Sequence, residues 1–432
     1  MYAKKSYSIA TFICTLAAMF YLYEFSLQVS LGVMTHELML DMGLNATSLG
    51  MVSAFYYYAY TPMQIPAGLL HDKYGPRRML TVAVLACALG ALFFGFSQSM
   101  IQASIGRLLM GAGSAFSFTG ALLLIARWFP PTYFAVLSGV VQLMSSVGAI
   151  GGELPLAVAI RHWGWRDSML GLAILGLILA YAIWHFVRDF PSNDHATTSQ
   201  KIVRHIQEKP QGLKQILQCS ETWWIAGYSF LIWAPVTAFA GLWGVPFLVA
   251  AKHLSTESAS VAIAIIWIGI GIGSPLSGWI SEYLQKRSNI LTLCGALGLV
   301  ASVMIIYVSL PLIALYGFLF VLGLSCGGQS LAFCVVRDIS HPSSIGTSIG
   351  INNMATVASG AILQPIIGWL LCLNWNGALL DHAPIYSLSD YRIGLLMIPI
   401  CYALATFISV RRIGETNCQP RYSIQHLIVG SE

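Results

Sequence analysis

Long apolar runs separated by short polar breaks make up most of the chain. A helix needs about 20 mostly apolar residues to cross the roughly 30 Å hydrocarbon core of a bilayer, and twelve runs reach that length. We expect helices over residues 8–34, 48–70, 78–98, 101–126, 134–158, 166–187, 222–250, 257–281, 289–308, 311–336, 344–372 and 391–410. The pattern predicts an all-α integral membrane protein.

One long polar stretch divides the twelve predicted helices into two groups of six. It covers residues 188–221, and we expect it to be a linker with one surface helix around 198–209. The predicted organisation is a first six-helix bundle, a linker, a second six-helix bundle and a tail, over residues 1–187, 188–221, 222–411 and 412–432.

Composition supports the membrane prediction, and the positions of the charges predict an orientation. Charged residues make up 9% of the 432 residues, against about 25% in a soluble domain, and the mean hydropathy is +0.72. With the N-terminus inside, seventeen of the 22 Lys and Arg residues fall in inside segments. Because cytoplasmic loops carry such an excess, we expect cytoplasmic termini in a bacterial inner membrane, and a net charge of +5 that reflects orientation rather than nucleic-acid binding.

The two halves of the chain resemble each other when the sequence is shifted by 210 residues. Glycines match often by chance, so the matches between charged residues are the more informative ones. The shift superposes Asp72 on Glu282, Arg77 on Arg287 and Arg127 on Arg337. Two six-helix repeats joined by a linker are a transporter architecture with the substrate site between the halves. We therefore expect two pseudo-symmetric bundles around a central cavity.

The segment GLLHDKYGPRR, residues 68–78, follows the second predicted helix. It resembles the loop signature of the major facilitator superfamily, G-x-L-x-D-x-x-G-x-[RK]-[RK], and a degenerate copy, GWISEYLQKRS, lies at 278–288. The resemblance implies a charge latch between the halves, centred on Asp72, and a conformational switch formed by Gly68, Asp72, Gly75, Arg77, Arg78, Glu282 and Arg287. The alternative is a tight turn whose basic residues only set the topology, which leaves Asp72 unexplained.

Three charged residues lie clearly within the predicted helices: Glu24, Arg107 and Glu153. Such groups are costly in a membrane and mark substrate or ion pathways. At 1.5 Å per residue, the depths of Glu24 and Arg107 differ by roughly 6 Å, so we expect them to pair. The segment RLLMGAGSA at 107–115 resembles the superfamily's fourth-helix signature, which links its Arg to proton coupling. The alternative is a static ion pair that only joins two helices.

Glu153 is the third expected coupling residue. Its segment, GAIGGELPL, partly resembles the superfamily's antiporter signature, but Ala149 stands in place of the proline, and close-packed glycines explain the match equally well. The 210-residue shift places Ala234, Gly317 and Leu363 opposite the three charged residues. We therefore expect proton coupling in the first bundle.

The residues expected to line the cavity are polar or aromatic. On the first and fourth helices they share a helical face with Glu24 or Arg107, and in the second half they are uncharged. The expected cavity residues are Tyr21, Gln28, Tyr57, Tyr60, Ser114, Gln142, Trp233, Trp243, Gln329 and Asn353.

These observations predict a proton-coupled symporter of a small polar or anionic solute that works by alternating access. Protonation of Glu24 would free Arg107 to bind an anionic group. The alternatives are export of an amphipathic compound or siderophore, and a non-transporting sensor, which the tail of about twenty residues after Arg412 disfavours. We expect no enzymatic activity, cofactor or metal site, since no H-E-x-x-H, phosphate-loop or C-x-x-C motif occurs. The expected partners are solute, protons and lipid, with the chain acting as a monomer.

Overall fold

The computed structural model describes residues 2–129, 131–190, 213–340, 345–373, 375–380, 383–419 and 421. Only the backbone is described at residues 2–7, 72, 131–136, 213–215 and 345–346. The surface helix expected around 198–209 lies outside the described residues.

The first half contains six membrane-spanning segments. Its elements are α1 (Tyr2–Val29), the 3₁₀ segment η1 (Ser30–Val33), α2 (Thr35–Met42), α3 (Ala46–Tyr74), α4 (Pro76–Gly95), α5 (Met100–Ser114), α6 (Ser117–Trp128) and α7 (Pro131–Phe186). α5 and α6 together form the fourth span. α7 contains two spans, because the backbone breaks at Gly164, whose φ of 81° favours glycine.

The second half repeats this arrangement. Its elements are α9 (Leu213–Gln218), α10 (Ser220–Ala234), the π-helical segment η2 (Pro235–Trp243), α11 (Gly244–Lys252), α12 (Thr256–Leu284), α13 (Arg287–Tyr307), α14 (Leu312–Ser325), α15 (Gly328–Ile339), α16 (Ile345–Leu373), β1 (Leu379–Leu380), β2 (Ala383–Pro384), α17 (Leu388–Gly394) and α18 (Met397–Arg411). α10, η2 and α11 form one span, as do α14 with α15 and α17 with α18.

Ten segments of the described residues are long and apolar enough to cross a membrane. One of them, Leu137–Phe186, is 50 residues long and contains the two spans of α7. α3 has 29 residues, the length of a span, but its tyrosines and two internal prolines make it less apolar. The twelve predicted helices are therefore confirmed; the sequence did not predict the short α2 or the antiparallel β1–β2 hairpin.

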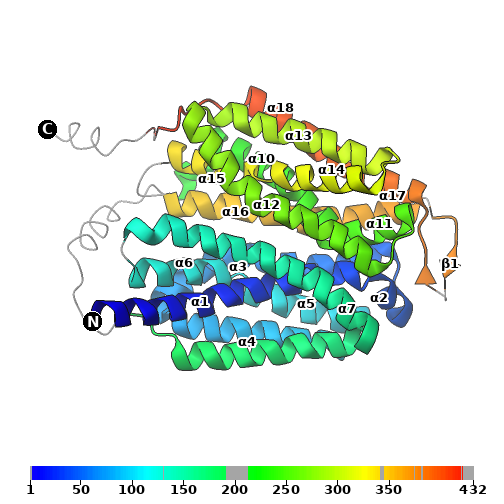
Figure 1. Cartoon of the computed structure of the whole chain (residues 1–432), viewed down its shortest axis with the longest axis horizontal. Coiled ribbons are helices and arrows are strands. Elements are labelled where there is room, and N and C mark those ends of the chain that lie inside the picture. The colour runs from blue at the N-terminus through cyan, green and yellow to red at the C-terminus, as the bar shows by residue number, and fades with distance from the viewer. Residues whose placement is uncertain are drawn as a thin grey trace.

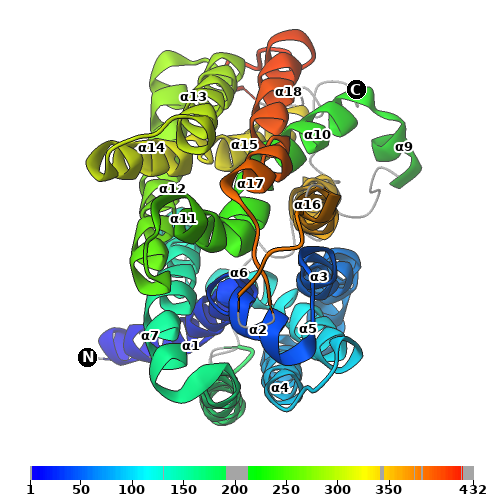
Figure 2. The same cartoon turned by 90° about the vertical axis from the view of Figure 1, so that its right-hand side faces the viewer.

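The halves pack side by side with their helices roughly parallel to the long axis (Figure 1), and the end view separates them clearly (Figure 2). A shift of 210 residues maps α3 (46–74) onto α12 (256–284). Between the halves α3 packs on α16 and α12 packs on α7, so the two contacts are related by the same pseudo-symmetry. The core between the helices buries large side chains such as Phe20, Tyr57 and Trp243.

The bundle has two ends. The start of α1 and the end of α7 lie at one end, left in Figure 1, which we call the linker face. α2 and the hairpin lie at the other, which we call the distal face. At the linker face, Gly75 (φ 83°) and Pro76, at the first position of α4, force the turn between α3 and α4.

Candidate transport site

Glu24 lies on α1 in the middle of the first half and is 1% exposed. Its Oε1 accepts a hydrogen bond of 3.2 Å from the Tyr56 hydroxyl on α3. Its Oε2 has no hydrogen-bond partner among the described residues. A carboxyl group with one neutral donor and no cation is an unusual and costly arrangement in a protein interior.

Arg107 on α5 is also fully buried, and its guanidinium caps the end of α1. It donates hydrogen bonds to the backbone oxygens of Leu27 at 2.8 Å and Gln28 at 3.3 Å. The last carbonyl groups of an α-helix have no partner within the helix, and α1 ends at Val29. A cation is favourable at this end of a helix dipole.

Tyr56 lies between the two charged residues. Its hydroxyl contacts Glu24, and the Arg107 guanidinium lies 4.7 Å from its ring centre in a cation–π contact. The expected Glu24–Arg107 ion pair is therefore wrong for this conformation: none joins them among the described contacts, because the α1 carbonyls hold the guanidinium and Tyr56 occupies the intervening space. Their shared contact with Tyr56 agrees with the similar depth expected from the sequence.

Tyr57 connects the site to the second half. Gln28 Nε2 donates to its hydroxyl at 3.1 Å, and its ring packs against Gly360 on α16, where an added Cβ would lie 2.7 Å from the ring. Nearby, Gln364 Nε2 donates to the Thr237 backbone oxygen at 2.7 Å. Gln28 Oε1, Gln364 Oε1 and Arg107 Nε are buried and lack a hydrogen-bond partner in the described structure, which is uncommon for polar atoms in a protein interior.

The second half adds uncharged polar groups. Gln329 donates to Thr356 at 2.6 Å, and Asn353 donates to Gln64 on α3 at 3.0 Å, which joins the halves. Trp243 is fully buried on η2, with its indole N–H bonded to the Gln364 backbone oxygen.

The remaining expected cavity residues lie around this centre. Tyr60 stacks on Tyr56 with ring centres 5.8 Å apart, and Tyr21 packs on Phe25 and Phe118. Ser114 lies 3.5 Å from Cys87 on α4 and also contacts Tyr56. Gln142 bonds to Ser145 in its own helix and contacts Tyr21, and Trp233 is partly buried on α10.

Glu153 does not join the Glu24 cluster but contacts the other half. Its Oε1 accepts a hydrogen bond of 2.8 Å from Trp267 on α12, and both side chains are buried. Its Oε2 has no partner in the described structure. Sequence reasoning missed Trp267, although the 210-residue shift places it on Tyr57, the residue that makes the equivalent contact between the halves.

At the distal face the halves touch closely. Arg161 forms an ion pair with Glu257 at 3.2 Å, and Thr47 donates to the Gly368 backbone oxygen at 3.3 Å. η1 also meets η2: a Cβ on Gly32 would lie 3.5 Å from two backbone oxygens of η2. The irregular segments of the first and seventh spans thus pack against each other.

Toward the linker face the same helices diverge. On α3, Gly50 touches the α16 backbone, whereas Gly68, further along the same stripe, has no atom within 4 Å of a Cβ position. Gly350 on α16, Gly139 on α7 and Gly278 on α12 are equally open. The halves are therefore closed at the distal face and separated at the linker face.

This two-fold bundle, with charged groups buried in one half, can be compared with known proteins. A model of the Major Facilitator Superfamily matches residues 8–365. The chain belongs to the major facilitator superfamily.

Relatives and solved structures agree with this assignment. The chain is 26% identical over 358 residues to the hexuronate transporter of Bacillus subtilis, covering 77% of this chain and 81% of the relative. It is 26% identical over 284 residues to a probable sulfoacetate transporter, SauU, of Cupriavidus necator, covering 62% of this chain and 64% of the relative. The structure of a D-xylose–proton symporter superposes with a TM-score of 0.70 at 15% identity, over 94% of this chain and 98% of that one, which shows the shared fold. The chain is a multi-pass membrane transporter, not an enzyme.

The superfamily's loop signature makes contacts within each half. The side chain of Asp72 lies outside the described residues, so the expected latch stays a prediction. The Arg77 backbone N–H donates to Asp189 at 2.8 Å, while Arg78 and Glu282 are exposed. Arg287 is buried and bonds to Asp338 at 3.1 Å; this pair, beyond the predicted spans, adds to the three buried charges expected from sequence.

Proposed function

We propose that this chain is a proton-coupled symporter of a small anionic organic solute. The observation that carries the proposal is the arrangement of Glu24, Tyr56 and Arg107, in which a buried carboxyl group and a buried cation flank one tyrosine. An ionised Glu24 with one neutral donor would be strongly unfavourable in this environment. We infer that Glu24 carries a proton in the conformation described here.

Arg107 is the proposed binding group for the solute anion. Guanidinium groups bind carboxylate, sulfonate and phosphate with two parallel hydrogen bonds. The N–H groups that would do so now hold the end of α1. A solute anion that takes them would release α1 at its break, and this links binding to movement of α1 against η2.

The relatives support an anionic solute. Hexuronate carries a carboxylate, and sulfoacetate carries both a carboxylate and a sulfonate. In this chain Arg107 would take the anionic group, and the amides of Gln329, Asn353 and Gln364 would take hydroxyl or other polar groups. This division assigns charge recognition to the first half and polar recognition to the second.

Glu153 is proposed as a second proton site that responds to the conformation. Its bond to Trp267 joins α7 to α12, and this bond breaks when the distal face opens. Water on that side then reaches the carboxyl group. Glu153 would exchange its proton only in the distal-open state, as a coupled cycle requires.

The proposed cycle moves solute and proton from the distal face to the linker face. The excess of Lys and Arg supports a cytoplasmic linker face, and in that orientation the conformation described here, closed distally, would be the one that opens inward. Asp72, Arg77, Arg78, Glu282 and Arg287 would hold the linker face closed in the opposite state. The proposed location is a bacterial inner membrane, with the protein working as a monomer.

Uptake into proteoliposomes tests the substrate class. Glucuronate, sulfoacetate and glucose 6-phosphate would be compared with neutral glucose, with and without an inward proton gradient. For a univalent anion moved with one proton, we expect accumulation of about tenfold for each pH unit. Extrusion of a cationic dye driven by the gradient, with uptake of none of the anions, would contradict the proposal and favour an exporter.

Two substitutions at Tyr56 separate the role of its hydroxyl from that of its ring. Tyr56→Phe removes the donor to Glu24 but keeps the ring under Arg107. We expect gradient-driven uptake to fall roughly 5- to 150-fold, the effect of about 1–3 kcal/mol for a lost buried hydrogen bond, with solute affinity unchanged. Tyr56→Leu removes the ring as well and should also weaken solute binding. The control is Tyr58→Phe, because Tyr58 is exposed on α3; equal effects of the two Phe variants would refute the assignment.

A further inference from the structure

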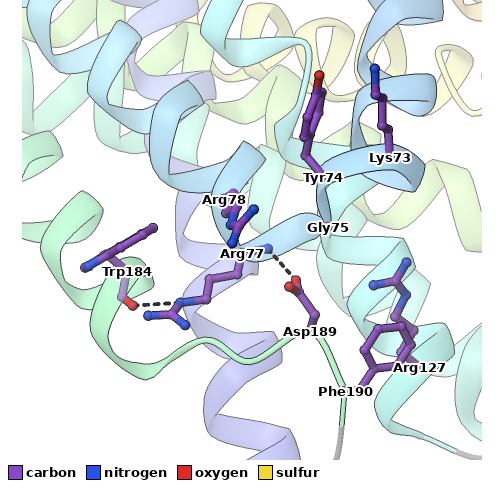
Figure 3. Close-up of a pocket in the computed structure, with 9 residues that line it drawn as sticks. All are labelled: Lys73, Tyr74, Gly75, Arg77, Arg78, Arg127, Trp184, Asp189 and Phe190. Atoms are coloured by element: carbon purple, nitrogen blue, oxygen red, sulfur yellow. Dashed lines mark hydrogen bonds between the residues drawn. The ribbon is translucent and has the colours of Figure 1, made fainter.

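A recess of about 610 Å³ opens at the linker face within the first half, apart from the transport site. Four basic side chains line it, from three separate parts of the chain (Figure 3). Lys73 comes from the end of α3, Arg77 and Arg78 from the start of α4, and Arg127 from the end of α6.

Three of these cations lie against aromatic rings that also line the recess. The Arg77 guanidinium lies 4.7 Å from the Trp184 ring centre, that of Arg127 lies 4.4 Å from Phe190, and the Lys73 ammonium lies 5.1 Å from Tyr74. A guanidinium stacked by its face keeps N–H groups at its edge, and those groups fit phosphate oxygens. The rings thus hold the cations in place without neutralising them.

Asp189 is the carboxylate among the lining residues, and it is already engaged. Its Oδ1 accepts the Arg77 backbone N–H at 2.8 Å, and its carboxylate lies over Gly75, at the start of α4 (Figure 3). Among the described residues, no ion pair involves Lys73, Arg77 or Arg78. Among the described side chains, the lining therefore contains four basic groups and one carboxylate.

The equivalent place in the second half shows that this excess is not required by the fold. There Glu415 accepts the backbone N–H groups of Arg287 and Ser288, as Asp189 does in the first half. However, the Arg287 side chain is buried against Asp338, which Arg337 also contacts. An acidic residue that accepts backbone N–H groups at the start of a helix is therefore found in both halves. The cluster of exposed cations, in contrast, is a feature of the first half among the described residues.

The position of the recess favours a lipid. It lies at the ends of membrane-spanning helices, where Trp and Tyr mark the water interface. Directly beside it, α4 exposes Val82 (60%) and α7 exposes Ile178 (60%) and Tyr181 (67%). Tyr181 is one helical turn from Trp184, and Val82 is one turn from Arg78, so an apolar surface leads from the recess along the membrane-facing side.

We propose that this recess binds the phosphate headgroup of an anionic phospholipid from the leaflet at the linker face, with the acyl chains along α4 and the second span of α7. Basic clusters next to a membrane attract such headgroups. The proposal is independent of the transported solute.

The test measures lipid binding to the full-length protein. Protein in nanodiscs of phosphatidylcholine, with or without phosphatidylglycerol, would be examined by native mass spectrometry for retained lipid and by thermal unfolding. Lys73→Gln/Arg78→Gln should weaken phosphatidylglycerol binding roughly 10- to 30-fold, the loss expected for two basic residues at a membrane surface. Lys73→Arg/Arg78→Lys keeps both charges and should retain binding, which separates a charge effect from misfolding.

The matched control removes two exposed cations from the same face of the second half, as Lys286→Gln/Arg411→Gln. It should bind phosphatidylglycerol like wild type. An equal loss in this control would show only a general attraction of the face for anionic lipid and would overturn the proposal. Equal stabilisation by inorganic phosphate or glucose 6-phosphate in detergent would assign the recess to a free anion and would also overturn it.

Discussion

Replacing Glu24 with glutamine is expected to abolish solute accumulation driven by the proton gradient while leaving solute counterflow intact. Glutamine fits the same space and its carbonyl oxygen can accept the Tyr56 hydrogen bond, but it cannot bind and release a proton. The gradient then does no work on the solute, so the variant should lose the whole accumulation factor, about tenfold for each pH unit. Uptake and counterflow of glucuronate in proteoliposomes provide the measurement.

The control for this variant is Asp167→Asn, which makes the same chemical change at an exposed residue without hydrogen-bond partners in the described structure. It should accumulate solute like wild type. Full accumulation by Glu24→Gln would remove Glu24 from the coupling mechanism. Loss of both activities, with a lower unfolding temperature, would instead give the residue a static structural role.

Gly50→Val is expected to prevent closure of the distal face. A Cβ at this position would lie 2.6 Å from the Gln364 backbone oxygen and 3.1 Å from the Pro365 Cα in the other half, and the α16 backbone can move away only if the halves separate. Overpacking of about 1–3 kcal/mol would shift the conformational equilibrium roughly 5- to 150-fold toward the distal-open state. Transport should be lost, with solute binding from the distal side retained.

Spin labels at His162 and His253, both exposed at the distal face of different halves, would report this shift as a longer distance in pulsed electron resonance. Gly171→Val is the control, because Gly171 is an exposed helical glycine with nothing within 4 Å of its Cβ position. If Gly50→Val keeps the short distance and normal uptake, the close distal contact is not part of the cycle.

The fold was predictable because a membrane imposes a strong constraint on sequence. Each span needs a long apolar run, and such runs are visible without tertiary information. The interruptions within the spans were not visible. η1, η2 and the division of α5 from α6 depend on packing between helices, and apolar sequence continues across all three.

The candidate site was predictable in its charged residues but not in their contacts. Glu24 and Arg107 stand out because charges are rare inside spans, and helical rise indicated their similar depth. Their separation by Tyr56 follows from the end of α1 at Val29, which no apolar pattern marks. Trp267 was missed because a tryptophan in an apolar run looks like packing, although the repeat related it to Tyr57.

The loop signature showed a further limit. Arg287, which we propose as a switch residue at the linker face, is buried and bonded to Asp338, a contact that the sequence did not predict. Asp338 lies two residues beyond the predicted end of its helix at 336, so its burial could not be predicted from the apolar pattern. Which charged residues contact each other near the ends of spans can therefore be determined only from the structure.

The most direct test of proton symport is the internal pH of proteoliposomes when an inward gradient of glucuronate is imposed without a proton gradient. We expect solute entry to acidify the interior in wild type, and we expect no pH change with Glu24→Gln. Internal alkalinisation in wild type, or solute entry without any pH change, would contradict coupled movement of the solute and the proton.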